Sequence, residues 1–459
     1  MFRKYETLHF KIARSLINDK LKALFRIKLT IISAWLLLAF TLQSHAQIWS
    51  PVGGGMDTAG IYAMTKDSVN LYAAGTFGNA GGSPAKCIAG WDGSNWTNLA
   101  SGLGFGVAAL VPYNGYLYAG GVFSHYILRW NGSAWSYVNS LATGPNFQVY
   151  ALAVYQGCLY AGGDFQYSSG FKTNFIAKWN GTVWDSVGSG MNHQVLTLDT
   201  CNGLLYAGGS FTSAGGISAN YIASWNGTSW SALGSGADAD VQSLGNYNGN
   251  LIAGGLFTNA GGQPANYIAK WDGSNWSSLG SGMNGGSQIE AITEYKGNLY
   301  AGGLFSQAGG NNANNIAFWN GTAWSALGSG TSDEVWSLVV YQAQLYAGGL
   351  FQKAGGNLVM GVAKWDENTG IWENITDNSV SAFPNPSSGR FSFKFDQAYP
   401  KTEIQIYNIL GENISTTLMS DNGSAVIKEI DLSNEPKGVY FYRLLSEKKV
   451  VSSGKLIVQ

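Results

Sequence analysis

The strongest constraint on the fold is a repeat that fills the chain from about residue 49 to residue 376. Every copy contains LYAGG or a close variant, followed two residues later by a phenylalanine and further downstream by two tryptophans. The first tryptophans of successive copies lie 39 to 49 residues apart. A period in this range is typical of propellers and solenoids. The seven cores lie at 71–75, 117–121, 159–163, 205–209, 251–255, 299–303 and 345–349.

One copy, residues 241–279, predicts four short strands at 241–247, 251–257, 267–271 and 275–279. Asn248-Gly249 is a hairpin signal, because both central residues of a type I′ turn need positive φ. The paired glycines of the second strand suit a place where backbones crowd together. The two tryptophans are five residues apart across a tight turn, so we expect them to face each other as a cross-strand pair.

A sheet of this kind is apolar on both faces and has open edges, so it must stack on neighbours. Radial stacking buries both faces and leaves only short edges, which predicts a propeller. Residues 48–52 resemble a fourth strand with no blade before it. The chain therefore has eight candidates for the fourth strand but only seven complete sets of first, second and third strands. The count favours seven blades, with either 48–52 or the strand near Trp372 outside it.

A glycine pair that ends a strand, followed by two aromatic residues around a turn, resembles the kelch repeat. The copy at 362–375 is the most similar, although tryptophan stands where kelch repeats usually have tyrosine. The resemblance implies a propeller and little about function. We therefore predict an all-β chain: a seven-bladed β-propeller of four-stranded blades at 47–377, followed by a small Ig-like β-sandwich.

Residues 1–46 have the pattern of a signal peptide. Eight Lys and Arg residues among the first 28 precede an apolar run at 30–42, and Ser44-His45-Ala46 follows as a small-residue cleavage pattern. The run of 13 residues is short of the ~20 needed to cross a bilayer. We expect no stable membrane span after processing, with a retained anchor as the alternative.

The composition changes at residue 378, where alternating apolar strands separated by Asn, Gly and Pro turns predict a small antiparallel sandwich. Pro384-Asn385-Pro386 with Gly389, the central IQIYNILG, Gly438-Val439-Tyr440 and a basic-then-apolar end resemble the type A C-terminal sorting domain of the type IX secretion system. The resemblance implies that residues 378–459 engage that machinery and are then removed, leaving the protein on the cell surface or released. The alternative is a structural Ig-like domain.

Charge and cysteine content exclude several classes of function. Residues 47–377 contain nine Lys and Arg against 17 Asp and Glu. Nucleic acid and anionic membranes both need a basic stripe, so neither is an expected partner. The three cysteines lie at non-equivalent repeat positions and predict no disulfide framework. No cofactor motif is present.

No catalytic or metal-binding constellation emerges from the sequence. His125 and His193 lie in different repeats, whereas zinc and copper sites need two or three converging nitrogen or sulfur ligands. Carboxylates near the first strands of three successive repeats could converge at the axis to bind Ca²⁺ or form an acid–base pair. Solvated loop charge is the favoured alternative for these residues, which are Asp238, Asp240, Glu290, Asp333 and Glu334.

The most irregular repeats predict a binding notch. The second-to-third and fourth-to-first connections are long and share one face, where ligands are expected. The phenylalanine that follows each core lies 14 residues before the first tryptophan in six repeats, but only seven residues before it in the second repeat. The third repeat replaces the usual AGG loop with QYSSGFKTN. The residues expected to line the notch are His125, Tyr126, Phe147, Tyr167 and Phe171, unless these aromatic rings fill the core that the missing loop leaves.

These features together predict an exported module for binding or adhesion at the cell surface, with a glycan or a surface protein as ligand. The main alternative is a secreted carbohydrate-active enzyme, which should show convergent carboxylates with shifted pKa values in a pocket. A binder should show aromatic residues without them. A purely structural surface protein should show no well-formed pocket.

Overall fold

The computed structural model describes residues 47–58, 60–104, 106–122, 127–138, 148–168, 171–284, 287–367, 380–395, 402–408, 413–418, 427–446 and 449–459. The chain divides into a unit at Gln47–Glu367 and a second unit that contains the strands from residue 380 onward. The described residues are all β-structure and turns, and they include no helix. The predicted signal peptide at 1–46 lies outside them.

Each copy of the repeat forms one four-stranded antiparallel sheet, as predicted. In the copy discussed above, β24 (Val241–Tyr247), β25 (Asn250–Gly255), β28 (Ile268–Trp271) and β29 (Trp276–Ser278) pair in that order. Asn248 and Gly249 both have positive φ, 49° and 72°, as the predicted hairpin requires. Trp271 pairs directly with Trp276, and their ring centroids lie 5.0 to 5.6 Å apart in all such pairs of the ring.

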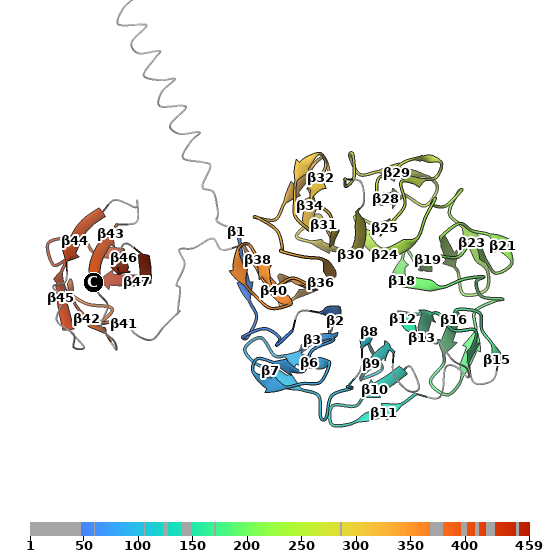
Figure 1. The fold of residues 1–459 in the computed structure, drawn as a ribbon, viewed down its shortest axis with the longest axis horizontal. Coiled ribbons are helices and arrows are strands. Elements are labelled where there is room, and N and C mark those ends of the chain that lie inside the picture. The colour runs from blue at the N-terminus through green and yellow to red at the C-terminus, as the bar shows by residue number, and fades with distance from the viewer. Residues whose placement is uncertain are drawn as a thin grey trace, which may run out of the picture. The chain divides into compact units, whose positions relative to one another are not determined.

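Seven such sheets occur in the described part of Gln47–Glu367 and follow one another around a ring, with the first strand of each sheet innermost (Figure 1). This arrangement is propeller-like. Five of the other sheets share the order of the sheet above: β2 (Ile61–Lys66), β3 (Leu71–Gly75), β6 (Ile88–Trp91) and β7 (Trp96–Asn98); β8 (Val107–Tyr113), β9 (Tyr116–Gly121), β10 (Ile127–Trp130) and β11 (Trp135–Tyr137); β12 (Val149–Tyr155), β13 (Cys158–Gly163), β16 (Ile176–Trp179) and β17 (Trp184–Ser186); β18 (Val195–Cys201), β19 (Leu204–Gly209), β22 (Ile222–Trp225) and β23 (Trp230–Ala232); β30 (Gln288–Tyr295), β31 (Asn298–Leu304), β34 (Ile316–Trp319) and β35 (Trp324–Ala326).

The remaining sheet joins the two ends of the ring. It combines β36 (Val335–Tyr341), β37 (Gln344–Gly349) and β40 (Val362–Glu367) with the N-terminal strand β1 (Gln47–Pro51). Trp49 pairs with Trp365, so the N-terminal strand takes the fourth position that the sequence left open. Trp49, not Trp372, is therefore the partner of Trp365, and Trp372 lies outside the described residues.

The AGG connections, expected to be simple loops, form two-residue hairpins instead. Ala260 of β26 pairs with Gln263 of β27, and the positive φ of Gly261 and Gly262 makes the turn between them. A bridge from Ala237 to Ala260 ties this hairpin to the connection that enters its own sheet. The hairpins are β4 (Asn79–Ala80) with β5 (Ser83–Pro84), β14 (Tyr167–Ser168) with β15 (Phe171–Lys172), β20 (Ser213–Ala214) with β21 (Ile217–Ser218), β26 (Asn259–Ala260) with β27 (Gln263–Pro264), β32 (Gln307–Ala308) with β33 (Asn311–Asn312), and β38 (Lys353–Ala354) with β39 (Asn357–Leu358).

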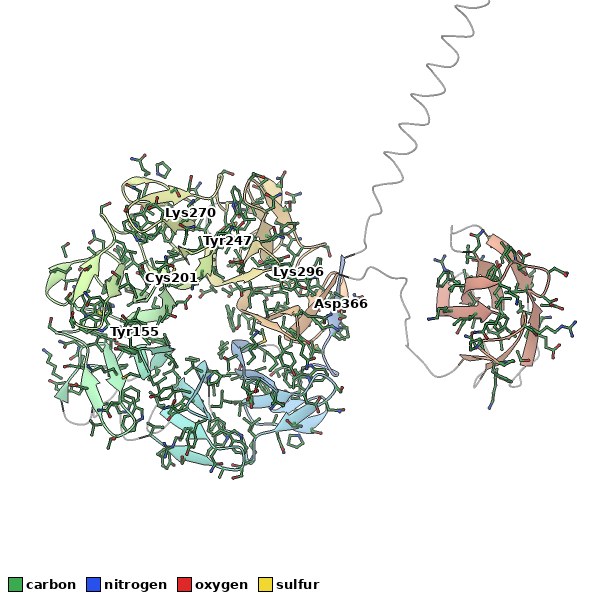
Figure 2. All side chains as sticks on the ribbon, turned by 180° about the vertical axis from the view of Figure 1, so that it is seen from behind. Tyr155, Cys201, Tyr247, Lys270, Lys296 and Asp366 are labelled. Carbon is green, nitrogen blue, oxygen red and sulfur yellow. The ribbon has the colours of Figure 1, made fainter. Side chains whose placement is uncertain are left out.

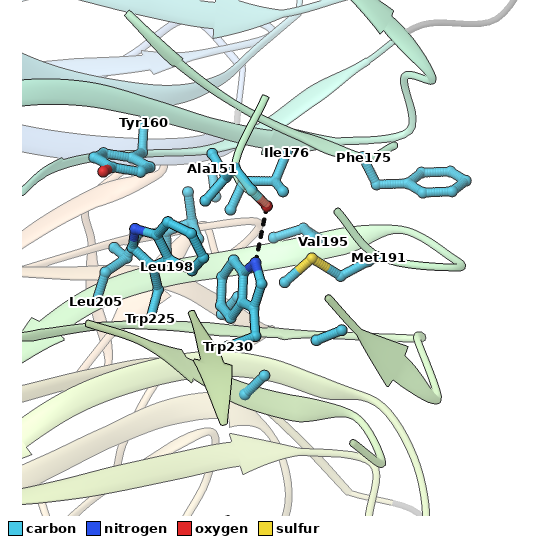
Figure 3. Packing of buried hydrophobic residues seen from close by; sticks show 14 of the residues in the cluster. Ala151, Tyr160, Phe175, Ile176, Met191, Val195, Leu198, Leu205, Trp225 and Trp230 are labelled. Carbon is cyan, nitrogen blue, oxygen red and sulfur yellow. Dashed lines mark hydrogen bonds between the residues drawn. The ribbon is translucent and has the colours of Figure 1, made fainter. Parts of the chain in front are cut away.

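Tryptophan indoles tie six of the seven sheets to the sheet before them. Trp230 is buried against Trp225, and its Nε1 donates to the carbonyl oxygen of Val187 in the preceding repeat at 2.9 Å (Figure 3). Five other second-position tryptophans donate in the same way to a Val or Leu carbonyl one sheet earlier: Trp49, Trp96, Trp135, Trp276 and Trp324. The buried Nε1 of Trp184 has no such partner among the described residues.

Tyrosines tie neighbouring sheets at the other end of the first strands. The hydroxyl of Tyr155 donates to the carbonyl oxygen of Gly203 at 3.0 Å, and that of Tyr341 donates to Val69 across the junction of the ring at 2.6 Å. Figure 2 labels the residues at this position in three successive sheets, Tyr155, Cys201 and Tyr247. At Cys201 the thiol donates to the carbonyl oxygen of Gly249 at 3.9 Å, and the side-chain amide of Asn202 donates to the same oxygen at 2.8 Å. Cys201 thus occupies a buried packing position, and all three cysteines are free.

The glycine pair fixes the spacing between sheets. A Cβ on Gly254 would lie 2.6 Å from Cγ2 of Ile289 in the next sheet, and a Cβ on Gly255 would lie 2.1 Å from the carbonyl oxygen of Asp240. Both positions exclude any larger residue unless the backbone moves. The predicted close approach of backbones is confirmed at Gly255, whereas at Gly254 the close neighbours are side-chain atoms of Ile289 and Ser243.

The second unit contains two antiparallel sheets. One has the order β41 (Val380–Phe383), β42 (Arg390–Phe395) and β45 (Ile427–Asp431). The other has the order β44 (Asn413–Leu418), β43 (Thr402–Tyr407), β46 (Gly438–Ser446) and β47 (Lys449–Val458). Phe391 and Phe393 of the first sheet are buried in one cluster with Ile404, Ile406 and Leu444 of the second.

Candidate binding site on the axis of the ring

Each of the seven first strands has an irregularity near its start, at the second residue in six of them and at the third residue of β30. The pairing of β30 with β31 shifts between Ile289 and Ala291, which leaves Glu290 without a partner in the register. The same shift occurs in the six other sheets. A bulge of this kind turns a side chain away from the direction that the regular strand would give it. The unpaired residues, which we call the bulge ring, are Tyr62, Ala108, Tyr150, Leu196, Gln242, Glu290 and Trp336.

All seven residues of the bulge ring line a single hollow of about 640 Å³. Because the first strands surround the centre of the ring, this hollow, the axial pocket, lies on its axis (Figure 1). The second residue of a first strand lies near the fourth-to-first connection. The axial pocket is therefore at the end of the ring that carries the longer connections.

An aromatic pair forms one wall of the axial pocket. The rings of Tyr62 and Trp336, from neighbouring sheets, are stacked with centroids 4.7 Å apart and planes 25° from parallel. The Nε1 of Trp336 donates to Oε2 of Glu334 at 2.7 Å, which fixes the indole. Tyr62 remains 37% exposed, so part of this flat apolar surface is open to a ligand.

Beside the aromatic pair lie two carboxylates and an amide. Burial, and then the negative charge of Glu334, raise the pKa of Glu290 to about 7. Oε1 of Gln242, on the other side of Glu290, is buried and has no hydrogen-bond partner among the described residues. The described lining of the pocket contains no Lys, Arg or His, so these acceptors face a hollow that offers no cation.

Of the five carboxylates singled out in the sequence, two reach the axial pocket. Asp238 instead holds a hairpin, since it accepts bonds from the backbone N–H groups of Thr258 and Asn259 at 2.8 and 2.9 Å. Asp240 accepts a bond from the hydroxyl of Ser210 at 2.8 Å. Loop charge therefore describes these two residues, whereas Glu290 and Glu334 converge near the axis.

The predicted notch lies mostly outside the described residues, because His125, Tyr126 and Phe147 are not among them. Tyr167 is 40% exposed on the hairpin β14–β15, where it pairs with Lys172. Phe171 lies on the same hairpin, opposite Ser168. Figure 1 shows β15 at the outer rim of the ring, and Tyr167 does not line the axial pocket.

Sequence reasoning missed the aromatic and amide residues of the bulge ring. They lie within predicted strands, and a bulge without a glycine gives no local sign of itself. A signal was nevertheless present in the repeat. When the seven copies are aligned, the residue before the bulge is always Ile or Val, and the residue after it is always Ala, Ser or Thr, whereas the bulged residue differs widely.

In the C-terminal unit, the Pro-Asn-Pro segment is built into the end of the sheet. The amide of Asn385 donates to the carbonyl oxygen of Lys455 at 2.6 Å, and its oxygen accepts from the N–H of Ile457 at 2.9 Å. A Cβ on Gly389 would lie 2.5 Å from the Cα of Ser433. The Tyr440 hydroxyl donates to the carbonyl oxygen of Pro436, four residues upstream. The motifs of this segment are therefore structural ties.

Residues 381–459 match the family described as the secretion system C-terminal sorting domain. The chain carries a sorting domain. It is therefore exported through the type IX secretion system to the cell surface or the extracellular space, and interaction with that machinery follows. The described residues include no helix that is long and apolar enough to cross a membrane.

No curated protein matches the chain. One similar solved structure is the extracellular domain of a protein described as a hybrid two component system from B. thetaiotaomicron, with 13% identity, a TM-score of 0.49 and coverage of 82% of this chain. The chain spans about half, 48%, of that structure. Another is PorZ, a surface component of the type-IX secretion system of Porphyromonas gingivalis, with 14% identity, a TM-score of 0.33 and coverage of 87% of this chain and 66% of the other. Likeness at this level carries no information about function.

Proposed function

We propose that the protein is an exported binding or adhesion module that holds its ligand in the axial pocket of a seven-bladed, kelch-like propeller. In this proposal residues 1–46 are a signal peptide, residues 47–377 form the propeller, and residues 378–459 form an Ig-like sorting domain that is removed after export. The observation that supports binding is the bulge ring. Seven side chains from seven sheets converge on one pocket, yet they serve no common packing role.

The lining of the axial pocket supports a glycan as the ligand. Ligand sites combine apolar and aromatic walls with a few polar groups that fix orientation. The stacked Tyr62 and Trp336 offer a flat apolar surface on which the face of a sugar ring can lie. Glu290, Glu334 and Gln242 beside it present acceptors, and sugar hydroxyl groups are donors.

A secreted carbohydrate-active enzyme is the second candidate, and one observation favours it. A carboxyl group with a pKa of about 7 can hold a proton at neutral pH, as a general acid must, and a second carboxylate lies in the same pocket. Binding is the preferred proposal because, among the described residues, no further side chain beside Glu290 and Glu334 is placed to activate a water molecule or to protonate a leaving group. A glycan that is bound and then released as shorter products would favour the enzyme.

The test is a glycan array probed with the purified secreted protein, followed by titration of each glycan that binds. Tyr62→Ala should weaken binding about tenfold or more, since truncation of an aromatic anchor in a pocket typically costs ~2 kcal/mol or more and a tenfold change corresponds to ~1.4 kcal/mol. The matched control is Tyr167→Ala, a tyrosine of similar exposure at the outer rim. A loss of binding with Tyr167→Ala and none with Tyr62→Ala would move the site to the predicted notch. Binding that neither variant changes would refute both locations.

A further inference from the structure

At the bulge ring, side-chain chemistry differs widely between the copies while the residues on either side stay nearly uniform. The flanking residues are uniform because they pack between sheets: the residue before the bulge meets the first glycine of the preceding sheet's pair, as Ile289 meets Gly254. The bulged residue faces the axial pocket and has no such partner. Its seven members are two tyrosines, alanine, leucine, glutamine, glutamate and tryptophan.

Aromatic and polar members of the bulge ring are grouped on neighbouring sheets. The aromatic members Trp336 and Tyr62 come from adjacent sheets and stack. The polar members Gln242 and Glu290 come from the two sheets that precede Trp336 around the ring. Glu334, two residues before Trp336, joins the polar members to the aromatic ones through its bond to the indole. The pocket therefore has one acidic side, which adjoins the aromatic pair of Tyr62 and Trp336.

From this arrangement we propose that the axial pocket recognises a protonated amine on a glycan, that is, an amino sugar whose nitrogen is free and not acetylated. The inference rests on the proposed function and narrows its ligand class. The charged groups in the described lining are the carboxylates of Glu290 and Glu334, which only accept when ionised, and the unpartnered Oε1 of Gln242 is a further acceptor beside them. An ammonium group carries only donors and a positive charge.

Charge balance favours an amine over a hydroxyl group. The negative charge of Glu334 acts on Glu290, and none of the ion pairs in the described part of the chain includes either residue. Two like charges in one pocket disfavour each other, and an ammonium group between them removes that cost. A neutral hydroxyl group can satisfy one acceptor and leaves the repulsion in place.

The aromatic pair adds to the preference for a protonated amine. A cation close to the face of tryptophan or tyrosine is attracted by the electrons of the ring, most strongly when water is excluded. The donation from Trp336 to Glu334 holds the indole beside the carboxylate, so a ligand in contact with the acidic side also meets the ring. The sugar body can then lie on Tyr62 while its amine reaches Glu290.

The test compares a glucosamine oligomer with its N-acetylated form of equal length, by calorimetric titration of the secreted protein at neutral pH. We expect the free amine to bind at least about tenfold more tightly, because a hydrogen bond to a charged group contributes more than one between neutral groups. Glu290→Gln should abolish the preference by weakening only the amine form. Glu294→Gln changes an exposed carboxylate of the same strand that does not line the pocket, and it should leave the preference intact.

The outcomes separate the two proposals. If wild type binds both oligomers equally, or if Glu290→Gln keeps the preference, recognition of the amine is wrong while glycan binding stands. If neither oligomer nor any glycan of the array binds, the proposed function fails as well. Because Glu290→Gln removes a charge that is repelled in the folded state, the variant should fold at least as well as wild type. Loss of binding through misfolding is then recognisable from its melting curve.

Discussion

Replacing Asp199 with asparagine should remove a pH dependence from the stability of the ring. Asp199 lies half-buried on β18 at the contact with the next sheet, where Asn246 donates to Oδ2 at 3.3 Å. Burial raises the pKa of Asp199 to about 6, although a bond from the Thr200 N–H opposes the shift. No cation is bonded to this carboxylate among the described residues, so ionisation in the folded state is costly.

The magnitude follows from the shift. The pKa rises from 3.8 in the unfolded chain to about 6 in the folded protein. At about 1.4 kcal/mol per unit, ionisation of Asp199 should cost about 3 kcal/mol of unfolding free energy. The folded state binds the proton more tightly, so stability is fully present below pH ~4 and is lost as the pH rises through ~6. Glu290, with its pKa raised to about 7, contributes a loss of the same sign at slightly higher pH.

The assay is urea unfolding of the whole chain, followed by tryptophan fluorescence between pH 4 and pH 8. None of the 17 tryptophans lies beyond residue 372, so the signal reports the ring and not the sorting domain. The unfolding free energy of Asp199→Asn, taken relative to that of wild type, should rise by about 3 kcal/mol between pH 4 and pH 8. A difference that stays constant over this range would refute the burial of Asp199. Glu290→Gln serves as a second, independent case.

Three further predictions concern the architecture and export. Trp225→Ala should destabilise the ring by about 3–5 kcal/mol in the same unfolding assay, because the side chain is only 3% exposed; a loss below ~1 kcal/mol would place it at the surface. Trp49→Ala should cost a similar amount, since β1 supplies the fourth strand of the closing sheet; a near-neutral result would mean that β1 does not close the ring. Deletion of residues 378–459 should retain the protein in the periplasm of its host, as fractionation and immunoblotting can show, and unchanged surface display or release would contradict the sorting role.

The sequence predicted the sheets well because the repeat supplies seven independent copies of the same evidence. The Asn248-Gly249 turn, the facing of Trp271 and Trp276, and the crowding at Gly254 each depend on short-range geometry that residue types determine. Closure of the ring was left open for a physical reason. Residues 48–52 and the segment near Trp372 both carry a tryptophan at the right place, and pairing across more than 300 residues has no local signature.

The candidate site was harder to predict because it arises from backbone irregularity. The search for irregular loops led to Tyr167 and Phe171, where the sequence departs from the repeat in length. The bulge ring instead departs in side-chain chemistry at constant length. The carboxylates illustrate the difference: Asp238 and Glu290 both lie near the start of a first strand, yet only the bulge directs Glu290 into the axial pocket.

The same geometry separates stability from recognition in this molecule. Contacts between sheets depend on the glycine pair, the tryptophan indoles and the Ile or Val that precedes each bulge, and those positions tolerate little change. The bulged residue packs against no neighbouring sheet in this way, so its replacement leaves those contacts in place. A repeat that is nearly uniform can therefore surround an asymmetric pocket. Tyr62→Ala is expected to alter binding far more than stability, whereas Trp225→Ala should do the reverse.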